Sequence, residues 1–262
     1  MEIPIYQVDA FTSRQFGGNP AAVCPLENWL PDATMQAIAA ENNLSETAFF
    51  VPVGDRFHLR WFTPTIEVDL CGHATLAAAY VIQEYLRYPS PAVQFDSRSG
   101  VLSVTRDGAR LTLDFPALPL TRCSPDSAIV EGLGVHPLEC YVAMDYMVVL
   151  GSEDDVRTLK PHFATLARVD RRGVIVTARG RDVDFVSRFF APGSGIDEDP
   201  VTGSAHCARA PYWSRRLGKK SMHALQVSAR GGELWVEDRG DRVTISGHVA
   251  PYLRGSITVI QL

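Results

Sequence analysis

The sequence lacks most features that would assign it to a common class of protein. Only five cysteines occur among 262 residues, widely scattered and without a C-x-x-C pair, which argues against a disulfide framework and against a zinc site. No stretch reaches 18 apolar residues, so we expect no transmembrane helix and no membrane partner. The net charge of −5 leaves no basic surplus for nucleic acid.

The usual signatures of nucleotide, zinc-protease and serine-hydrolase chemistry are also missing. The sequence contains no GxxxxGK[ST], no complete GxGxxG after a strand, no HExxH and no GxSxG. The composition, 46% hydrophobic and 21% charged, is typical of a globular protein with a sizeable core. We therefore expect a cytoplasmic protein that carries neither metal nor cofactor.

A short passage occurs twice in the chain. Arg60–Pro64 recurs as Arg188–Pro192, at an offset of 188 − 60 = 128 residues. Each copy is followed by an acidic stretch and a turn of small residues that opens an alanine-rich helix, Cys71–Ala74 in the first half and Thr202–Ala205 in the second. A hairpin signal follows in both halves. This pattern predicts two related half-domains that face each other across a cleft.

The fold class expected from these patterns is α+β. Short alternating segments predict many strands, and one long apolar helix is predicted in each half, Gly72–Leu86 and Gly203–Leu217. A third, amphipathic helix is expected over Asp32–Asn42. We predict a mainly antiparallel, curled sheet around each apolar helix. The two domains are expected to cover residues 1–118 and 119–262. The last strand, Ile257–Ile260, is assigned to the second domain or, alternatively, packs back on the first.

The two helix starts are candidates for binding a carboxylate. The first turn of a helix has N–H groups without partners in the helix and a partial positive charge, and small residues allow a ligand to come close. In the alternative, the glycines Gly72 and Gly203 simply begin buried helices. The occurrence of this arrangement in both halves favours the site.

Glu46 is the candidate acid/base, because it directly precedes an apolar strand where a carboxyl group can have a raised pKa. A solvated loop carboxylate is the simpler interpretation. The residue at the repeat offset, Val174, is not acidic, so a role of Glu46 is not duplicated.

Three further residues near the helix starts are candidates. His73 can act as a neutral donor or proton carrier, or it can be an ordinary buried or capping histidine. Asp199 is either a polar partner of the substrate or a capping residue. Cys71 could be a carbon-acid base as in two-thiol racemases, but its repeat counterpart is Thr202, and Cys207 lies inside the helix.

At these residues the chain resembles the phenazine-biosynthesis PhzF-like family. The matching passages are Asp9–Thr12 with Gly18–Pro20, Asn43–Ala48, Arg60–Pro64 with Leu70–Thr75, and Gly195–His206. The resemblance implies the fold of diaminopimelate epimerase and proline racemase, with the active site between two similar domains. It also implies cofactor-independent isomerisation by Glu46 and a homodimer.

Together, the residues and the resemblance predict a cofactor-independent isomerase that transfers a proton on a small carboxylate substrate. The predicted catalytic residues are Glu46, His73 and Asp199. The predicted substrate-binding residues are Asn19, Gly72, Ala74, Gly203, Ser204 and Ala205. An amino-acid racemase that uses Cys71 and a non-catalytic binding protein are the alternatives.

Overall fold

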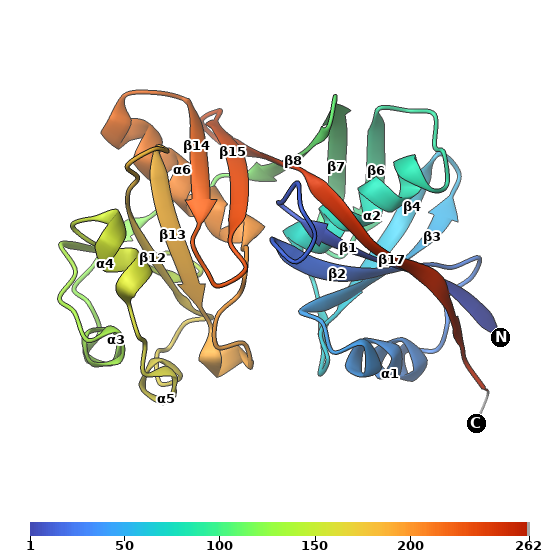
Figure 1. Ribbon diagram of the computed structural model, residues 1–262, viewed down its shortest axis with the longest axis horizontal. Coiled ribbons are helices and arrows are strands. Elements are labelled where there is room, and N and C mark those ends of the chain that lie inside the picture. The colour runs from blue at the N-terminus through green and yellow to red at the C-terminus, as the bar shows by residue number, and fades with distance from the viewer. Residues whose placement is uncertain (261–262) are drawn as a thin grey trace. The chain divides into compact units, whose positions relative to one another are not determined.

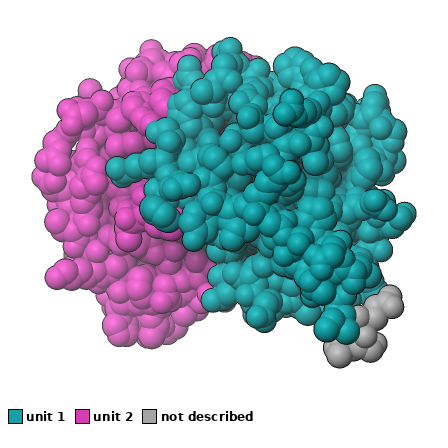
Figure 2. All heavy atoms as spheres, turned by 45° about the vertical axis from the view of Figure 1, so that its right-hand side comes forward, with its two compact units in different colours: residues 1–114, 246–262 teal, residues 115–245 magenta. Residues whose placement is uncertain are grey.

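The computed structural model describes residues 1–260, which form a mixed α+β chain with two compact units (Figure 2). Unit 1 consists of residues 1–114 together with the chain from residue 246 onward, and unit 2 consists of residues 115–245. The first division lies four residues before the predicted one at 118/119, and the last strand belongs to unit 1. No helix of residues 1–260 is both long enough and apolar enough to span a membrane.

Unit 1 is a sheet in which two parallel strand pairs interrupt an otherwise antiparallel order. The antiparallel pairs are β1–β17, β1–β2, β3–β4, β4–β5, β6–β7 and β7–β8, and the parallel pairs are β2–β3 and β4–β6. The strands are β1 (Glu2–Ala10), β2 (Asn19–Pro25), β3 (Glu46–Val53), β4 (Arg56–Phe62), β5 (Glu67–Val68), β6 (Ala92–Ser97), β7 (Gly100–Asp107), β8 (Arg110–Pro116) and β17 (Val249–Thr258).

Each parallel pair of unit 1 is joined through a helix, as a parallel connection requires. Helix α1 (Asp32–Asn42) connects β2 to β3, and α2 (Gly72–Glu84) lies between β4 and β6 in the sequence (Figure 1). Ten of the thirteen residues of α2 are buried, and the helix contacts β1, β2, β3, β7 and β17. A helix that is apolar on nearly all sides is thus enclosed by the strands of its own unit.

Unit 2 repeats the same order of pairs. Strands β11–β12 and β13–β14 are parallel, whereas β9–β10, β10–β11, β12–β13 and β14–β15 are antiparallel. Helix α6 (Gly203–Leu217) connects β13 to β14 and contacts β14 and β15. The other elements are β9 (Thr121–Arg122), α3 (Ser127–Leu133), β10 (Glu139–Val142), β11 (Tyr146–Val149), α4 (Glu153–Thr158), α5 (Phe163–Leu166), β12 (Val174–Arg179), β13 (Phe185–Phe190), η1 (Pro192–Ser194), β14 (Ser221–Gln226), β15 (Gly232–Asp238) and β16 (Arg242–Gly247).

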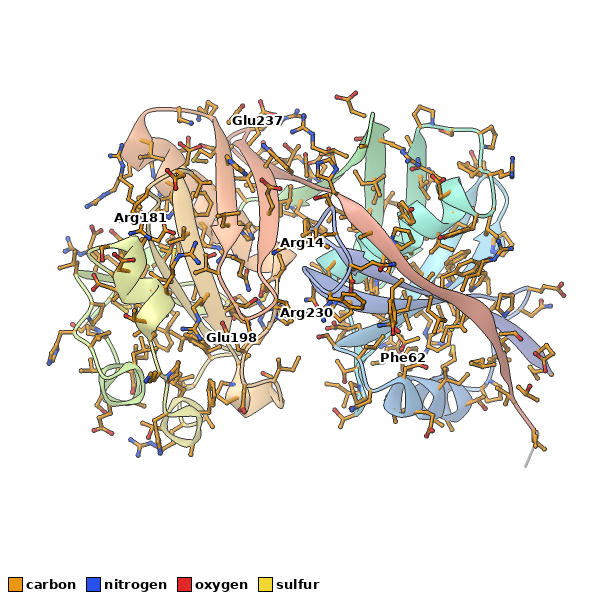
Figure 3. All side chains as sticks on the ribbon, in the orientation of Figure 1. Arg14, Phe62, Arg181, Glu198, Arg230 and Glu237 are labelled. Carbon is orange, nitrogen blue, oxygen red and sulfur yellow. The ribbon has the colours of Figure 1, made fainter. Side chains whose placement is uncertain are left out.

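The repeated arginine forms the same ion pair in both units. In unit 1, Arg60 Nε and Nη2 lie 2.7 and 2.8 Å from the two carboxylate oxygens of Glu67. In unit 2, Arg188 makes the same two-pronged contact with Glu198, labelled in Figure 3, at 2.7 and 2.8 Å. The arginine in each case ties the end of a strand to the loop that leads into the long helix.

Several elements differ from the sequence-based expectation. The final strand is not the short segment Ile257–Ile260, because β17 begins at Val249 and pairs along β1 over its whole length. Helices α3, α4 and α5, of four to seven residues, were not predicted. Helices this short are too brief to show a hydrophobic period, so the sequence carries little signal for them.

Gly18 is a position where the backbone requires glycine. Its φ is +60°, and an added Cβ would lie 2.1 Å from the carbonyl oxygen of Ala10. Gly54 has nearly the same φ, +61°, with no atom within 4 Å of an added Cβ. Gly54→Ala should therefore cost about 1 kcal/mol from backbone strain alone. Gly18→Ala should cost at least ~2 kcal/mol more, because it adds a steric clash. Denaturant unfolding would measure both, and equal losses would contradict the clash.

Candidate active site

Three elements of unit 1 bring four predicted or candidate residues together. Glu46 is the first residue of β3, Asn19 is the first residue of β2, and Cys71 and His73 lie at the start of α2. Strands β2 and β3 are neighbours, with Ala21 paired to Glu46. The site is therefore built where two parallel strands begin, next to a helix N-terminus.

Local backbone features determine where these strands begin. Asn43 adopts a left-handed conformation (φ 49°) at the C-cap of α1, which ends that helix three residues before Glu46. Gly18 adopts the left-handed region directly before Asn19, so the chain turns sharply into β2. Two left-handed residues thus place the side chains of Glu46 and Asn19.

The imidazole of His73 is the centre of the group. Its Nε2 lies 3.2 Å from Glu46 Oε2, and its Nδ1 lies 3.2 Å from Asn19 Nδ2 and 3.5 Å from Cys71 Sγ. The Nε2–Oε2 pair is close but not aligned as a hydrogen bond requires. Catalytic hydrogen bonds often become aligned only when a substrate is bound.

Burial controls the charge of this group. The side chain of His73 is 5% exposed, and removal from water lowers the pKa of its imidazole to about 3. The ring is therefore neutral at neutral pH. Glu46, with 14% of its side chain exposed, faces a neutral hydrogen-bonding ring rather than an imidazolium ion.

The start of α2 has no side-chain cap. Its N-cap residue, Cys71, makes no side-chain capping hydrogen bond. The Thr75 hydroxyl donates a hydrogen bond to the Cys71 carbonyl. The first turn, which includes Gly72 and Ala74, is buried, and no acidic residue lies in it. The N–H groups of such a turn favour an anionic group of a ligand.

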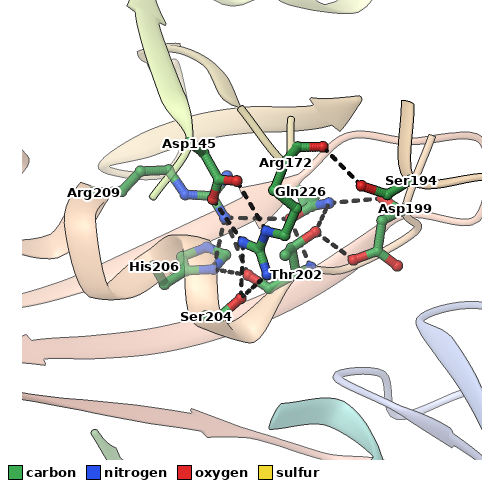
Figure 4. A network of polar contacts seen from close by, with 9 residues as sticks. All are labelled: Asp145, Arg172, Ser194, Asp199, Thr202, Ser204, His206, Arg209 and Gln226. Atoms are coloured by element: carbon green, nitrogen blue, oxygen red, sulfur yellow. Dashed lines mark hydrogen bonds and ion pairs between the residues drawn. The ribbon is translucent and has the colours of Figure 1, made fainter. Parts of the chain in front are cut away.

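The start of α6 in unit 2 is uncapped as well, although its N-cap residue, Thr202, is of a type that usually caps. The hydroxyl of Thr202 donates to Asp199 Oδ2 at 2.5 Å (Figure 4). Gln226 bridges the same two residues, because its amide donates to the Asp199 carbonyl at 2.8 Å and accepts from the Thr202 N–H at 3.0 Å. Asp199 is thus held in place and is not the cap of this helix.

Ser204, in the first turn of α6, is bound by an arginine. Both terminal nitrogens of Arg172 lie 3.3 Å from Ser204 Oγ, and Arg172 also pairs with the buried carboxylate of Asp145 at 2.9 and 2.6 Å. The hydroxyl oxygen of Ser204 therefore accepts hydrogen bonds from the guanidinium group. The hydroxyl proton of Ser204 remains available for donation to another acceptor.

A buried cation lies inside α6. Arg209 is fully buried; its Nη2 lies 2.8 Å from His206 Nδ1 and donates to the Thr202 carbonyl at 3.3 Å (Figure 4). Desolvation lowers the pKa of Arg209 to about 9, and burial, followed by the charge of Arg209, lowers the pKa of His206 well below its usual value. No sequence motif indicates this cluster, because an arginine is rarely expected in a buried core.

The second thiol needed for a two-thiol racemase is poorly suited to the task. Cys207 is 4% exposed, and burial raises the pKa of its thiol to about 12. Thr202, the counterpart of Cys71, carries a hydroxyl already committed to Asp199. Cys71, by contrast, lies at a helix start with its Sγ 3.5 Å from His73 Nδ1.

Among the described residues, Glu46, Cys71 and His73 could be considered as metal ligands, since one donor atom from each lies within 4.8 Å of the others. Oxygen, nitrogen and sulfur donors together suit Zn²⁺. However, Cys71 contacts Nδ1 of the imidazole and Glu46 contacts Nε2. One ion cannot use both nitrogens, so the arrangement fits a chain of hydrogen-bonding groups better than a metal centre.

The predicted site residues thus fall into two groups. In unit 1, Glu46, His73 and Asn19 are in contact or joined through His73, and Gly72 and Ala74 form the adjoining helix start. In unit 2, Asp199 is held beside the start of α6, which contains Gly203, Ser204 and Ala205. Residues that position these groups, such as Gln226 and Arg172, were not predicted, because only the folded chain brings them there.

Comparisons with known proteins agree with this architecture. The model of the family described as phenazine biosynthesis-like protein matches residues 8–255. An uncharacterized isomerase of Pseudomonas aeruginosa is 54% identical over 98% of this chain and 99% of its own length. A PhzF family protein of Enterococcus faecalis has the same fold, with a TM-score of 0.96, 47% identity, and coverage of 99% of this chain and 100% of that chain. A hydroxyproline epimerase of Agrobacterium vitis shares the fold at a TM-score of 0.66 and 11% identity, over 98% of this chain and 92% of that one.

The low pKa of His73 predicts how stability depends on pH. The folded pKa of about 3 lies below the unfolded value of 6.5, so between these values the unfolded state binds one more proton at this residue. His73 therefore removes about 1.4 kcal/mol of stability for each pH unit of acidification below 6.5. In His73→Gln the loss of stability between pH 6 and pH 4 should be less steep by this amount. Denaturant unfolding at several pH values would test it, and parallel curves would contradict it.

Proposed function

This chain belongs to the phenazine biosynthesis-like (PhzF) family, whose relatives include proteins named as isomerases, and we propose that it is a cofactor-independent isomerase acting on a small carboxylate substrate. The observation that carries the proposal is the contact of Glu46 with a neutral histidine at the uncapped start of a buried helix. A carboxylate, a neutral donor and free helix N–H groups together suit proton transfer at carbon.

In the proposed reaction Glu46 removes a proton from a carbon next to a conjugated system. The C–H bond breaks, its electron pair enters the conjugated system, and an O–H bond forms on the carboxyl group. The proton then returns at another carbon, so substrate and product have the same composition. The N–H groups at Gly72 and Ala74 hold the substrate carboxylate, whose developing negative charge they also stabilise.

Unit 2 supplies the remaining groups of the proposal. Asp199 acts as a polar partner of the substrate, and Gly203, Ser204 and Ala205 bind it through the second helix start. The fixed position of Asp199, held through Thr202 and Gln226, supports this role, as does the contact of Arg172 with Ser204. A homodimer in the cytoplasm is part of the same proposal by resemblance to the family.

A second candidate function, an amino-acid racemase or epimerase based on Cys71, is favoured by one observation. Cys71 Sγ lies 3.5 Å from His73 Nδ1, close enough for the imidazole to accept the thiol proton. The burial of Cys207 speaks against the second thiol such an enzyme would use. A racemase would exchange the α-proton of an amino acid with solvent, whereas the proposed isomerase moves a proton between two carbons.

Proton exchange in heavy water tests the function directly. The protein is incubated with a panel of cyclic and amino-acid carboxylates, and label uptake and isomer formation are followed by mass spectrometry and NMR. Glu46→Gln should reduce turnover by roughly 100- to 10,000-fold, the usual contribution of a general base, while ligand binding is largely retained.

The matched control is Glu41→Gln, which changes an exposed glutamate of α1. It should leave turnover unchanged. Full activity of Glu46→Gln would overturn the proposal, and loss of activity in Cys71→Ala together with labelling at the α-carbon would support the racemase instead.

A further inference from the structure

The side chain of His73 is held from two sides in a way that specifies where its proton sits. Nδ1 faces the amide nitrogen of Asn19 at 3.2 Å and the sulfur of Cys71 at 3.5 Å. Nε2 lies 3.2 Å from the carboxylate of Glu46. The two ring nitrogens therefore have chemically different surroundings.

These surroundings select one tautomer. An amide NH₂ group can donate a hydrogen bond but cannot accept one, and a thiol S–H is a weak donor. The amide therefore requires an acceptor at Nδ1, and the thiol is compatible with one, which means that Nδ1 carries no proton. In a neutral imidazole the proton must then be on Nε2, where it faces the acceptor oxygen of Glu46.

Asn19 is well suited to impose this choice because it is rigidly placed. It is fully buried and is the first residue of β2, where it pairs with Ala10 of β1. The preceding Gly18 approaches the Ala10 carbonyl so closely that no side chain fits there. The backbone that carries this amide therefore cannot move away from His73 without disturbing the sheet.

We propose that Asn19 is a positioning residue that fixes His73 as the neutral Nε2–H tautomer, so that His73 presents a proton on the side of Glu46 and is not a proton relay. Because Nε2 already carries a proton, it cannot accept the one that Glu46 removes from the substrate. Glu46 must keep that proton until it returns it to the substrate. The conclusion that Glu46 keeps the proton rests on the proposed function, whereas the assignment of the tautomer does not.

The tautomer can be read directly from the ring nitrogens. In ¹⁵N-labelled protein at pH 7, two-bond ¹H–¹⁵N correlations distinguish protonated from unprotonated nitrogens, and comparison with His73→Gln assigns His73 among the seven histidines. The wild type should show an unprotonated Nδ1 and a protonated Nε2. A protonated Nδ1 in the wild type would overturn the proposal.

The substitution Asn19→Asp replaces the side-chain amide by a carboxylate of nearly the same shape. Its carboxylate presents acceptors to Nδ1, so the Nδ1 resonance should move from the unprotonated to the protonated range. Asn42→Asp, which adds the same charge in α1 where the amide contacts Thr47, should keep the wild-type pattern. An unprotonated Nδ1 in folded Asn19→Asp would contradict the role of Asn19. If that variant does not fold, the wild-type spectrum still decides the tautomer.

Isotope tracing separates this inference from the function on which its consequence rests. With a turned-over substrate labelled by deuterium at the abstracted position, product should keep part of the label, since Glu46 passes the proton on without a relay. Complete loss of the label to solvent would contradict the proposal that Glu46 transfers the proton without a relay. Full activity of Glu46→Gln would overturn the proposed function and leave the tautomer unaffected.

Discussion

Both units depend on a largely buried, two-pronged ion pair between an arginine and a glutamate. Arg60 with Glu67, and Arg188 with Glu198, join the end of a strand to the loop that precedes a long helix, and in each unit the helix begins five residues after the glutamate. Each guanidinium also lies over a phenylalanine two residues further along its strand.

This common framework carries different polar groups in its two copies. Beyond the ion pair, α2 begins with a thiol and a neutral histidine, whereas α6 begins with a threonine bound to Asp199 and a serine bound to Arg172. Both helix starts lack a side-chain cap. The shared part of the repeat thus positions two electropositive helix starts, and the unlike part supplies the groups that can handle protons.

The sequence predicted the features that have a local signal. The bounds of Asp32–Asn42 and Gly203–Leu217 are confirmed, because small residues open the second helix and Asn43 and Gly218 end the two in left-handed conformations. The α+β fold and the family are confirmed as well.

Contacts between residues that are distant in the sequence have no local signal and were therefore not predicted. The contact of Asn19 with His73 spans 54 residues, and the bond of Gln226 to Thr202 spans 24. The bond that Asp199 accepts from the Thr202 hydroxyl has no local signal either, and the N-cap residue of α6 is Thr202. Arg209 is a residue type that the sequence alone would not place in a core.

The pairing of β17 with β1 has a consequence for how the protein folds during synthesis. Unit 2 is a continuous segment and is complete once residue 245 has left the ribosome. In unit 1, β1 precedes all of unit 2 in the sequence, whereas its partner β17 follows unit 2 and is made only later. Domains usually fold in the order in which they are made. Here the unit that begins first is finished after the other, and the apolar residues around α2 depend on β17 for their full enclosure.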